Sequence, residues 1–234
     1  MVNDLTALEI KNLKTYFFFD EGIVRAVDGV SLTLERGKTL GVVGESGCGK
    51  SVTAQSVLQI VGAGGRIVSG EILFHRDDGQ IVDLTQYKST SEELRQIRGR
   101  DIAMIFQEPM TAFAPVYTIG KQISEAILFH ENISAKAARS RVVDLLVKVG
   151  IPNAAQRVDA YPFELSGGMR QRAMIAMALA CKPTILIADE PTTALDVTIQ
   201  AQILDLLRSL QEEMGMAIMI ITHNMGVIAE MADT

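Results

Sequence analysis

The stretch GESGCGKS, residues 44–51, combines glycines, a lysine and a serine in an order that suits phosphate binding. It follows the apolar run KTLGVVG, which predicts a buried strand, and leads into residues 50–60, which predict a helix. Glycines in such a loop let backbone N–H groups wrap the β- and γ-phosphates of a nucleotide, while Lys50 supplies a cation and Ser51 offers a hydroxyl to Mg²⁺. The predicted phosphate-binding residues are Gly44, Glu45, Ser46, Gly47, Cys48, Gly49, Lys50 and Ser51.

The run ILIADE, residues 185–190, predicts a buried strand that ends in two carboxylates. Asp189 is placed to hold Mg²⁺ through water. Glu190 should point to the other side of the strand end, towards the γ-phosphate, and is our candidate to polarise an attacking water. The alternative is two ordinary carboxylates beside the turn PTT. The phosphate-binding loop in the same chain favours the catalytic interpretation.

Two further polar side chains are expected at the ends of core strands. Gln107 ends the run DIAMIFQ, and its amide can ligate Mg²⁺ or hold a water. His223 ends the run IITH, where an imidazole can hydrogen-bond the γ-phosphate and sense its presence. The alternatives are an ordinary polar residue at a strand end and a structural histidine.

Consecutive aromatic residues, YFFF at positions 16–19, lie near the N-terminus. One of these rings can stack on an adenine base. The alternative is an edge strand that packs the rings into the core.

The stretch LSGGMRQR, residues 165–172, indicates a second site that attracts anions. A serine and two glycines precede good helix formers over residues 169–180. A helix N-terminus favours negative charge through its free N–H groups and its dipole. This stretch carries no lysine, and the chain already has a complete phosphate-binding loop.

The order of the predicted elements indicates an α/β core that a helical segment interrupts. Residues 5–17 and 22–37 alternate apolar and polar side chains, as half-buried antiparallel strands do. Helical periods alone follow from residue 118 to 159, with Ser134 as a helix N-cap and Gly150 just past a helix end. Strands are also expected at 70–74, 81–84, 101–106 and 217–222, and helices at 119–130, 134–150, 197–214 and from residue 224.

Composition and charge narrow the classes of protein. The 234 residues fit one compact α/β domain, and 22 basic against 28 acidic residues give a net charge of −6, which argues against nucleic-acid binding. Two cysteines indicate reduced thiols in the cytosol. The N-terminus carries no export signal, and the most apolar run, residues 173–181, is too short for a membrane span. A role at a membrane would therefore require docking to another protein.

Taken in order, GESGCGKS, Gln107, LSGG, ILIADE, ALD at residues 194–196 and His223 resemble the complete motif set of an ABC-transporter ATPase subunit over nearly the whole chain. The strings FQEPMT, LSGGMRQR and ADEPTTALDVTIQAQIL resemble most the oligopeptide/dipeptide importer ATPases, a branch with relatives for nickel and other small solutes. The resemblance implies an α/β fold: a P-loop NTPase (RecA-like) core with an N-terminal antiparallel β-subdomain and an inserted α-helical subdomain. We expect a single domain over 1–234, with the core at 1–107 and 161–234 and the helical subdomain at 108–160.

The resemblance also implies ATP and Mg²⁺ as cofactors and a role for each motif. Glu190 is the expected base, and Asp189, Ser51 and Gln107 surround the metal. Lys50 and His223 hold the γ-phosphate. Two subunits pair head to tail, so that the LSGG helix of one caps the γ-phosphate of the other. The residues expected to act across the dimer or on the adenine are Ser166, Gly167, Gly168, Asp196 at the dimer seam, and Phe17 or Tyr16 on the base.

The partners implied are transmembrane permease subunits, a second ATPase subunit in a homo- or heterodimer, and an extracytoplasmic solute-binding protein. The expected location is the cytoplasmic face of the inner membrane, as a peripheral protein. Gln107 and the segment after it should face the membrane partner. Three rival classes of protein are less consistent with the sequence. Non-transport ABC ATPases of DNA repair carry a long insertion before the LSGG helix, and those of translation usually carry two cassettes; this sequence shows neither feature. A kinase with the same phosphate-binding loop would not explain LSGG.

The chain departs from the family pattern at three positions. Met169 stands where Gln is usual, Val52 replaces a Thr so that only its backbone can contact the nucleotide, and Asn224 follows His223 where Asp is common. Because importer ATPases of this branch continue well past this histidine, we expect a C-terminal portion to be missing.

Overall fold

Two four-stranded sheets form the frame of the protein in the computed structural model, which describes residues 5–193 and 195–234. The antiparallel sheet has the order β2-β1-β4-β5. Its strands are β1 (Thr6–Phe19), β2 (Gly22–Glu35), β4 (Gly65–His75) and β5 (Ile81–Asp83). The second sheet is parallel, with the order β3-β8-β7-β6. Its strands are β3 (Thr39–Val43), β6 (Ile102–Ile105), β7 (Ile185–Asp189) and β8 (Ala217–Thr222).

The strands of the parallel sheet are mostly apolar, with polar residues at their ends such as Thr39, Asp189 and Thr222, because helices and the other sheet cover their faces. Every residue of β6, β7 and β8 is buried. Continuous apolar strands of this kind are typical of parallel sheets. The carboxyl ends of β3, β6, β7 and β8 meet at one edge, and the predicted loop, acids, amide and imidazole follow these ends.

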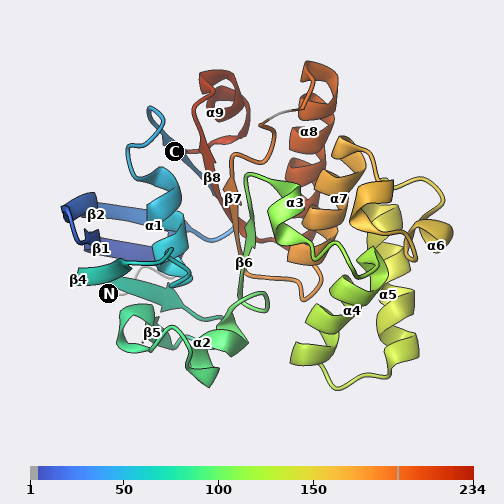
Figure 1. The fold of residues 1–234 in the computed structure, drawn as a ribbon, viewed down its shortest axis with the longest axis horizontal. Coiled ribbons are helices and arrows are strands. Elements are labelled where there is room, and N and C mark those ends of the chain that lie inside the picture. Colours follow the sequence, from blue (N-terminus) through green and yellow to red (C-terminus); the bar gives the residue numbers. More distant parts are fainter. Residues whose placement is uncertain (1–4, 194) are drawn as a thin grey trace.

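The helices lie on both sides of this sheet (Figure 1). Those of the α/β frame are α1 (Lys50–Val57), α2 (Glu92–Ile97), α7 (Gly167–Ala178), α8 (Val197–Met214) and α9 (Met225–Met231). The segment between β6 and α7 adds α3 (Pro109–Ala112), α4 (Ile119–His130), α5 (Ala135–Lys148) and α6 (Ala154–Arg157). Short 3-10 turns occur at Leu84–Gln86 and Pro162–Glu164. None of the helices within the described residues combines the length and the apolar character needed to cross a membrane.

Two hydrophobic clusters fill the interior, one on each face of the parallel sheet. On one face, α1 and the antiparallel sheet pack against side chains such as Ile187 and Met219. On the other, α4, α5, α7 and α8 pack together against Leu186 and Ile218. Successive residues of one strand therefore pack into opposite clusters, because side chains alternate between the two faces of a sheet. The helical segment shares its hydrophobic cluster with α7 and α8, and its treatment as a separate subdomain, with the boundaries given above, stays a prediction.

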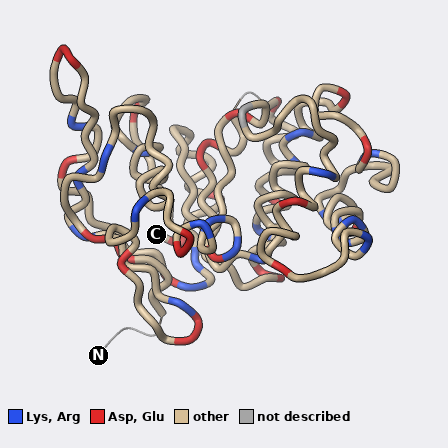
Figure 2. Tube along the Cα trace, turned by 60° about the horizontal axis from the view of Figure 1, so that its bottom comes forward, with Lys and Arg blue, Asp and Glu red and all other residues tan. Residues whose placement is uncertain are grey.

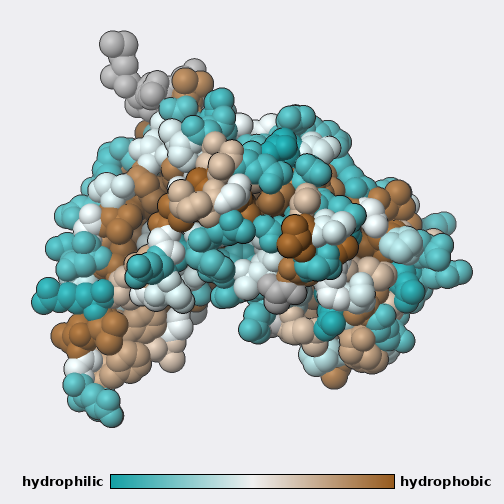
Figure 3. All heavy atoms as spheres, turned by 90° about the horizontal axis from the view of Figure 1, so that it is seen from above, coloured by the Kyte–Doolittle hydropathy of each residue, from teal (hydrophilic) through white to brown (hydrophobic). Residues whose placement is uncertain are grey.

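The outline has two lobes with a recess between them when seen from above (Figure 3). The antiparallel sheet occupies one lobe and the helices α4–α6 the other (Figure 1). Hydrophobic side chains are exposed at the hairpin of β1 and β2, including Phe19, Ile23 and Val24. Figure 2 shows basic and acidic residues interspersed over both lobes, so that both carry charges of both signs.

Local signals fixed several helix ends as predicted. Ser134 caps α5 through a hydrogen bond that its hydroxyl accepts from the Ala137 N–H, and Gly150 follows the helix at φ 77°. The predicted bounds of α4, α8 and β8 are confirmed to the residue. Others shift: α1 ends at Val57 rather than residue 60, β4 begins at Gly65 rather than 70, and α7 begins at Gly167 rather than 169.

Candidate nucleotide-binding site

Lys50 is the first residue of α1, directly after the loop that follows β3. Its ammonium donates to the carbonyl oxygens of Gly44 at 2.8 Å and Glu45 at 2.7 Å, and only 8% of the residue is exposed. The loop therefore curls around the lysine side chain. A cation held by loop carbonyls at a helix N-terminus is placed to exchange them for phosphate oxygens.

Glycine is required at Gly49, the residue that precedes α1. Its φ is 96°, and an added Cβ would lie 2.1 Å from the carbonyl oxygen of Ala26 in β2. A glycine N-cap offers no side-chain acceptor, and the first N–H groups of a helix lack intrahelical partners. The local sequence therefore leaves backbone donors for an anion beside Lys50.

Ser51 and Asp189 meet at the edge of the sheet. The Ser51 hydroxyl donates to Oδ1 of Asp189 at 2.9 Å. Asp189 is 4% exposed, and burial raises the pKa of its carboxyl above the ordinary value, although the bond from Ser51 and the charge of Lys50 act against this. A hydroxyl and one buried carboxylate are hard oxygen ligands that suit Mg²⁺. Within the described residues no group of three or more His, Cys, Asp and Glu side chains is arranged to hold a metal, so the pair fits an ion that shares its remaining ligands with phosphates and water.

Glu190 lies beyond the end of β7 in a left-handed conformation, with φ 48°. Its N–H donates to the Ile221 carbonyl in β8 at 2.9 Å, and its carbonyl accepts from the Thr193 N–H at 3.1 Å. These bonds hold a tight turn over residues 190–193. The left-handed backbone of Glu190 thus lies at the start of this turn, directly after Asp189 at the end of β7.

The Glu190 carboxylate gathers three side chains around it. Oε2 accepts from the Gln107 amide at 3.1 Å and from the Thr193 hydroxyl at 2.8 Å, and Oε1 lies 3.2 Å from Nδ1 of His223. Burial alone would raise the pKa of Glu190, but hydrogen bonds from His223 and Thr193 outweigh it and lower the pKa. The carboxylate is therefore ionised at neutral pH. The structure brings together Gln107, Glu190 and His223 from the ends of β6, β7 and β8.

Thr193 was not among the predicted site residues. The PTT sequence predicts a turn, which the structure confirms, but no role was predicted for its side chains. The signal in the sequence is a threonine three residues after the candidate base, inside a tight turn, since such a hydroxyl can reach back to the carboxylate.

The predicted residues Ser166, Gly167 and Gly168 form the N-terminus of α7. The Ser166 hydroxyl accepts from the Met169 N–H at 3.3 Å, and Ser166 and Gly167 are exposed. Helix α7 packs on the face of the parallel sheet opposite to α1 (Figure 1). The structure therefore separates this second anion-attracting terminus from the phosphate-binding loop of the same chain.

Asp196 caps α8. Its Oδ1 accepts from the Ile199 N–H at 3.0 Å, and the residue is exposed. This capping role was not predicted, although an aspartate directly before a long helical run is a typical N-cap. Ala194, in the same ALD motif, lies outside the described residues.

The two candidate adenine-stacking aromatics differ in their surroundings. The Tyr16 hydroxyl donates to Oδ1 of Asp28 at 2.8 Å, and the Arg25 guanidinium lies over the Tyr16 ring at 5.7 Å. Phe17, the next residue of β1 after Tyr16, is half-buried. Its ring stacks on that of Phe19, with the ring centroids 6.1 Å apart. Tyr16 is therefore already engaged by its neighbours on β2.

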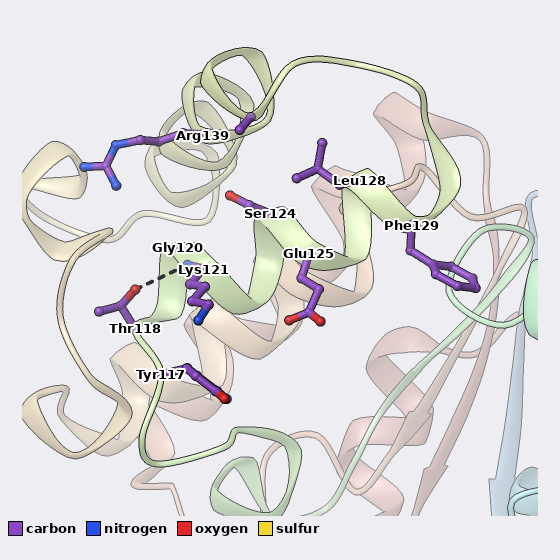
Figure 4. Close-up of a pocket in the computed structure, with 10 residues that line it drawn as sticks. Tyr117, Thr118, Gly120, Lys121, Ser124, Glu125, Leu128, Phe129 and Arg139 are labelled. Carbon is purple, nitrogen blue, oxygen red and sulfur yellow. Dashed lines mark hydrogen bonds between the residues drawn. The ribbon is translucent and has the colours of Figure 1, made fainter.

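A groove of about 670 Å³ opens along α4 and the start of α5 (Figure 4). Lys121, Glu125 and Phe129 follow one another along one side of α4, and Tyr117 lies below its first turn. The Thr118 hydroxyl caps the helix by accepting from the Lys121 N–H at 3.3 Å. The groove thus begins shortly after Gln107 in the chain, past α3.

Comparisons with known proteins identify the family of the chain. A profile described as ABC transporter matches residues 27–193. The chain is 52% identical to the glutathione import ATP-binding protein GsiA of Pectobacterium atrosepticum, over 100% of its own length and 37% of that protein. It is 54% identical to a putative peptide import ATP-binding protein of Brucella ovis, over 96% of the chain and 66% of that protein. It is 50% identical to the oligopeptide transport ATP-binding protein AppD of Bacillus subtilis, over 97% of the chain and 68% of that protein.

Solved structures are similar over nearly the whole chain. The dimeric structure of a bacterial ABC transporter cassette superposes with a TM-score of 0.82 at 27% identity, covering 96% of this chain and 91% of that one. A second dimeric structure, of a post-hydrolysis state with ADP and Pi bound, matches equally well. These matches confirm the predicted α/β P-loop fold and the resemblance to importer ATPases. Because the profile spans more than half of the chain, and because AppD is covered over 68% of its length at 50% identity, this chain belongs to the ABC transporter family.

Proposed function

We propose that the protein binds and hydrolyses ATP as the nucleotide-binding subunit of a membrane importer for peptides or peptide-like solutes. The observation that carries the proposal is the convergence of Gln107, Thr193 and His223 on the Glu190 carboxylate, in a chain whose phosphate-binding loop curls around Lys50. The names of relatives at 50–54% identity refer to peptide, oligopeptide and glutathione import. They favour import over the non-transport alternatives.

In the proposed nucleotide site, Lys50 and the loop residues, with the Val52 backbone, bind the phosphates of ATP. Ser51 and Asp189 would hold Mg²⁺, together with Gln107. The ion supplies positive charge that offsets the charge on the β- and γ-phosphates. Its proposed ligands are a hydroxyl, a carboxylate and an amide, all of them oxygen donors.

Hydrolysis requires a base for the attacking water, and Glu190 suits this task. Its carboxylate is ionised because its pKa is lowered, so it can take a proton from water as the water oxygen attacks the γ-phosphorus. The bond from that phosphorus to the β–γ bridging oxygen breaks, leaving ADP and phosphate. Gln107, Thr193 and His223 orient the carboxylate, and His223 is exposed enough to reach the γ-phosphate as well.

The proposal includes a head-to-tail dimer. Helix α7 presents Ser166, Gly167 and Gly168 away from its own phosphate-binding loop, so these groups suit the γ-phosphate bound by a second subunit. No lysine is needed on α7, because the loop of the second subunit brings its own. The similar cassettes are described as dimeric, which supports the pairing. Asp196, exposed at the start of α8, would lie at the seam.

The groove on α4 is the proposed docking site for a permease subunit. Val116 is 71% exposed, and Tyr117 and Phe129 are 44% exposed, so an apolar segment of the permease would cover them. Lys121 and Glu125 lie between these aromatics and can pair with charges on that segment. The names of the relatives refer to import, which supports such a partner. In the proposed system this subunit lies on the cytoplasmic face of the membrane. An extracytoplasmic solute-binding protein completes the system.

Replacement of Glu190 by glutamine tests the catalytic assignment. Glu190→Gln should lower ATP turnover by roughly 10²–10⁴-fold, the usual value of a general base, and leave ATP-bound dimers long-lived in light scattering. Glu212→Gln, on the exposed side of α8, is the matched control and should be active. Normal turnover by Glu190→Gln would contradict the assignment of Glu190 as the base. Co-purification of the full-length protein from native membranes, with identification of attached membrane proteins, tests the transport role.

A further inference from the structure

The last three residues of the LSGGMRQR stretch, residues 170–172, make contacts that the proposed function does not use. Arg170 donates to the Met110 sulfur at 2.8 Å, in α3. Gln171 donates to the Pro191 carbonyl at 2.6 Å. Arg172 donates to the Val149 carbonyl at 2.6 Å and to Gln202 in α8 at 3.1 Å. Three consecutive side chains therefore tie α7 to four other parts of the protein: α3, the turn at Pro191, the residue after α5, and α8.

The bond from Gln171 differs from the others in its burial. Gln171 is 2% exposed and is the first of the buried residues of α7, and Pro191 is buried as well. Burial of an amide is costly unless its hydrogen bonds are satisfied. This amide uses its donor on one backbone carbonyl, which belongs to the residue directly after Glu190.

The turn that carries Glu190 is thereby fixed from three directions. The Ile221 carbonyl in β8 accepts a hydrogen bond from the Glu190 N–H. The Thr193 N–H donates to the Glu190 carbonyl and closes the turn. The Gln171 amide in α7 donates to the Pro191 carbonyl. The first two contacts lie within the sheet edge and the turn. Only the third leads to the helix whose N-terminus is Ser166.

We propose that Gln171 is a positioning residue for Glu190. It fixes the carbonyl of Pro191 to α7, so that a shift of this helix moves the turn and the Glu190 carboxylate with it. This inference rests on the proposed function, in which the α7 N-terminus contacts nucleotide on a second subunit. Occupancy of the second subunit's nucleotide site thus controls the placement of the base in the first.

A purely structural role makes a different prediction from a positioning role. If Gln171 only satisfies a buried carbonyl, its loss should lower the stability of the protein and leave the turnover of folded molecules unchanged. If it positions Glu190, its loss should lower kcat, while the KM for ATP, set by the loop around Lys50, stays nearly constant.

The test is the steady-state ATPase activity of the full-length protein in its native assembly. Gln171→Met keeps the length of the side chain and removes the donor, and should lower kcat by about tenfold or more with KM changed less than about twofold. Gln202→Met makes the same substitution at an exposed partner of Arg172 and should keep wild-type kcat.

Gln171→Glu is the second variant and does not depend on the first one folding. A protonated glutamic acid donates to the Pro191 carbonyl, whereas its anion cannot. The ratio of its kcat to the wild-type value should therefore rise at least about threefold between pH 8 and pH 6.

Two results would overturn the inference: a kcat within twofold of wild type for Gln171→Met, or a pH-independent ratio for Gln171→Glu. A wild-type protein without ATPase activity would instead refute the proposed function itself. The two failures are therefore distinguishable.

Discussion

The side-chain amide of Gln107 donates to Oε2 of Glu190 across 3.1 Å and so links the end of β6 to the end of β7. The chain continues from Gln107 into α3 and then to the groove on α4. A displacement of this segment by a docked partner would therefore move one of the groups that orient the proposed base.

Replacement of Gln107 by methionine tests this link. Gln107→Met keeps the side-chain length and removes the donor, so kcat should fall by about tenfold while the ATP dissociation constant changes by less than about threefold. The measurements are steady-state ATPase rates and equilibrium nucleotide binding. Gln156→Met, exposed on α6, is the control. An unchanged kcat would show that the bond is irrelevant to turnover.

Much of the fold follows from signals that are local in the sequence. Helix α8 has a periodic apolar face, an aspartate at its start and Gly215 at φ 67° at its end, and its bounds were predicted to the residue. The premature end of α1 depends on distant groups instead. Gln59, just past the helix, has φ 48°, and its amide donates to the carbonyls of Leu84 and Tyr87. No local pattern shows such a tertiary bond.

The site follows the same division. Motif spacing predicted which side chains lie at the ends of β6, β7 and β8, because parallel strands share one edge. The bonds of Thr193 to Glu190 and of Gln171 to Pro191 depend on the φ of 48° at Glu190 and on the packing of α7. A left-handed glutamate is rare enough that sequence alone gives no reason to expect it.

Asp196 has a capping role in the structure and a proposed role at the dimer seam, and two substitutions separate them. Asp196→Ala removes the N-cap of α8 and should lower the free energy of unfolding by about 1 kcal/mol. Asp196→Ser keeps a capping oxygen and should be nearly as stable as wild type in urea denaturation. If Asp196 also lies at the seam, the serine variant should form less ATP-dependent dimer. Wild-type dimerisation of Asp196→Ser would limit the residue to capping.

Phe17 is the better candidate for stacking on adenine, because Tyr16 is engaged by Asp28 and Arg25. Phe17→Ala should weaken ATP binding by about 5- to 160-fold, since stacking of a base on an aromatic ring contributes about 1–3 kcal/mol. Phe17→Tyr should bind normally because it keeps a ring, and Tyr16→Ala should also bind normally because it removes only the other candidate ring. Titration with a fluorescent ATP analogue measures all three. Weaker binding by Tyr16→Ala and not by Phe17→Ala would reverse the assignment.

We expect His130 to make the stability of the protein depend on pH. It ends α4, and its Nδ1 is buried with no hydrogen-bond partner among the described residues. Burial lowers the pKa of His130 below its ordinary value of 6.5. Arg100 acts in the same direction, whereas a backbone bond to Arg98 and the charges of Asp101 and Glu131 act against it.

The sign of the effect follows from proton linkage. The unfolded chain binds a proton at His130 near pH 6.5, and the folded protein does so only at lower pH. Stability is therefore fully present above pH 6.5 and is lost as the pH falls towards the folded pKa, with a slope of at most about 1.4 kcal/mol per pH unit. His130→Gln should remove this part of the slope between pH 6.5 and 5 in urea denaturation, whereas His223→Gln, at a side chain that is 60% exposed, should keep it. Equal slopes for wild type and His130→Gln would mean that the buried imidazole carries no such penalty.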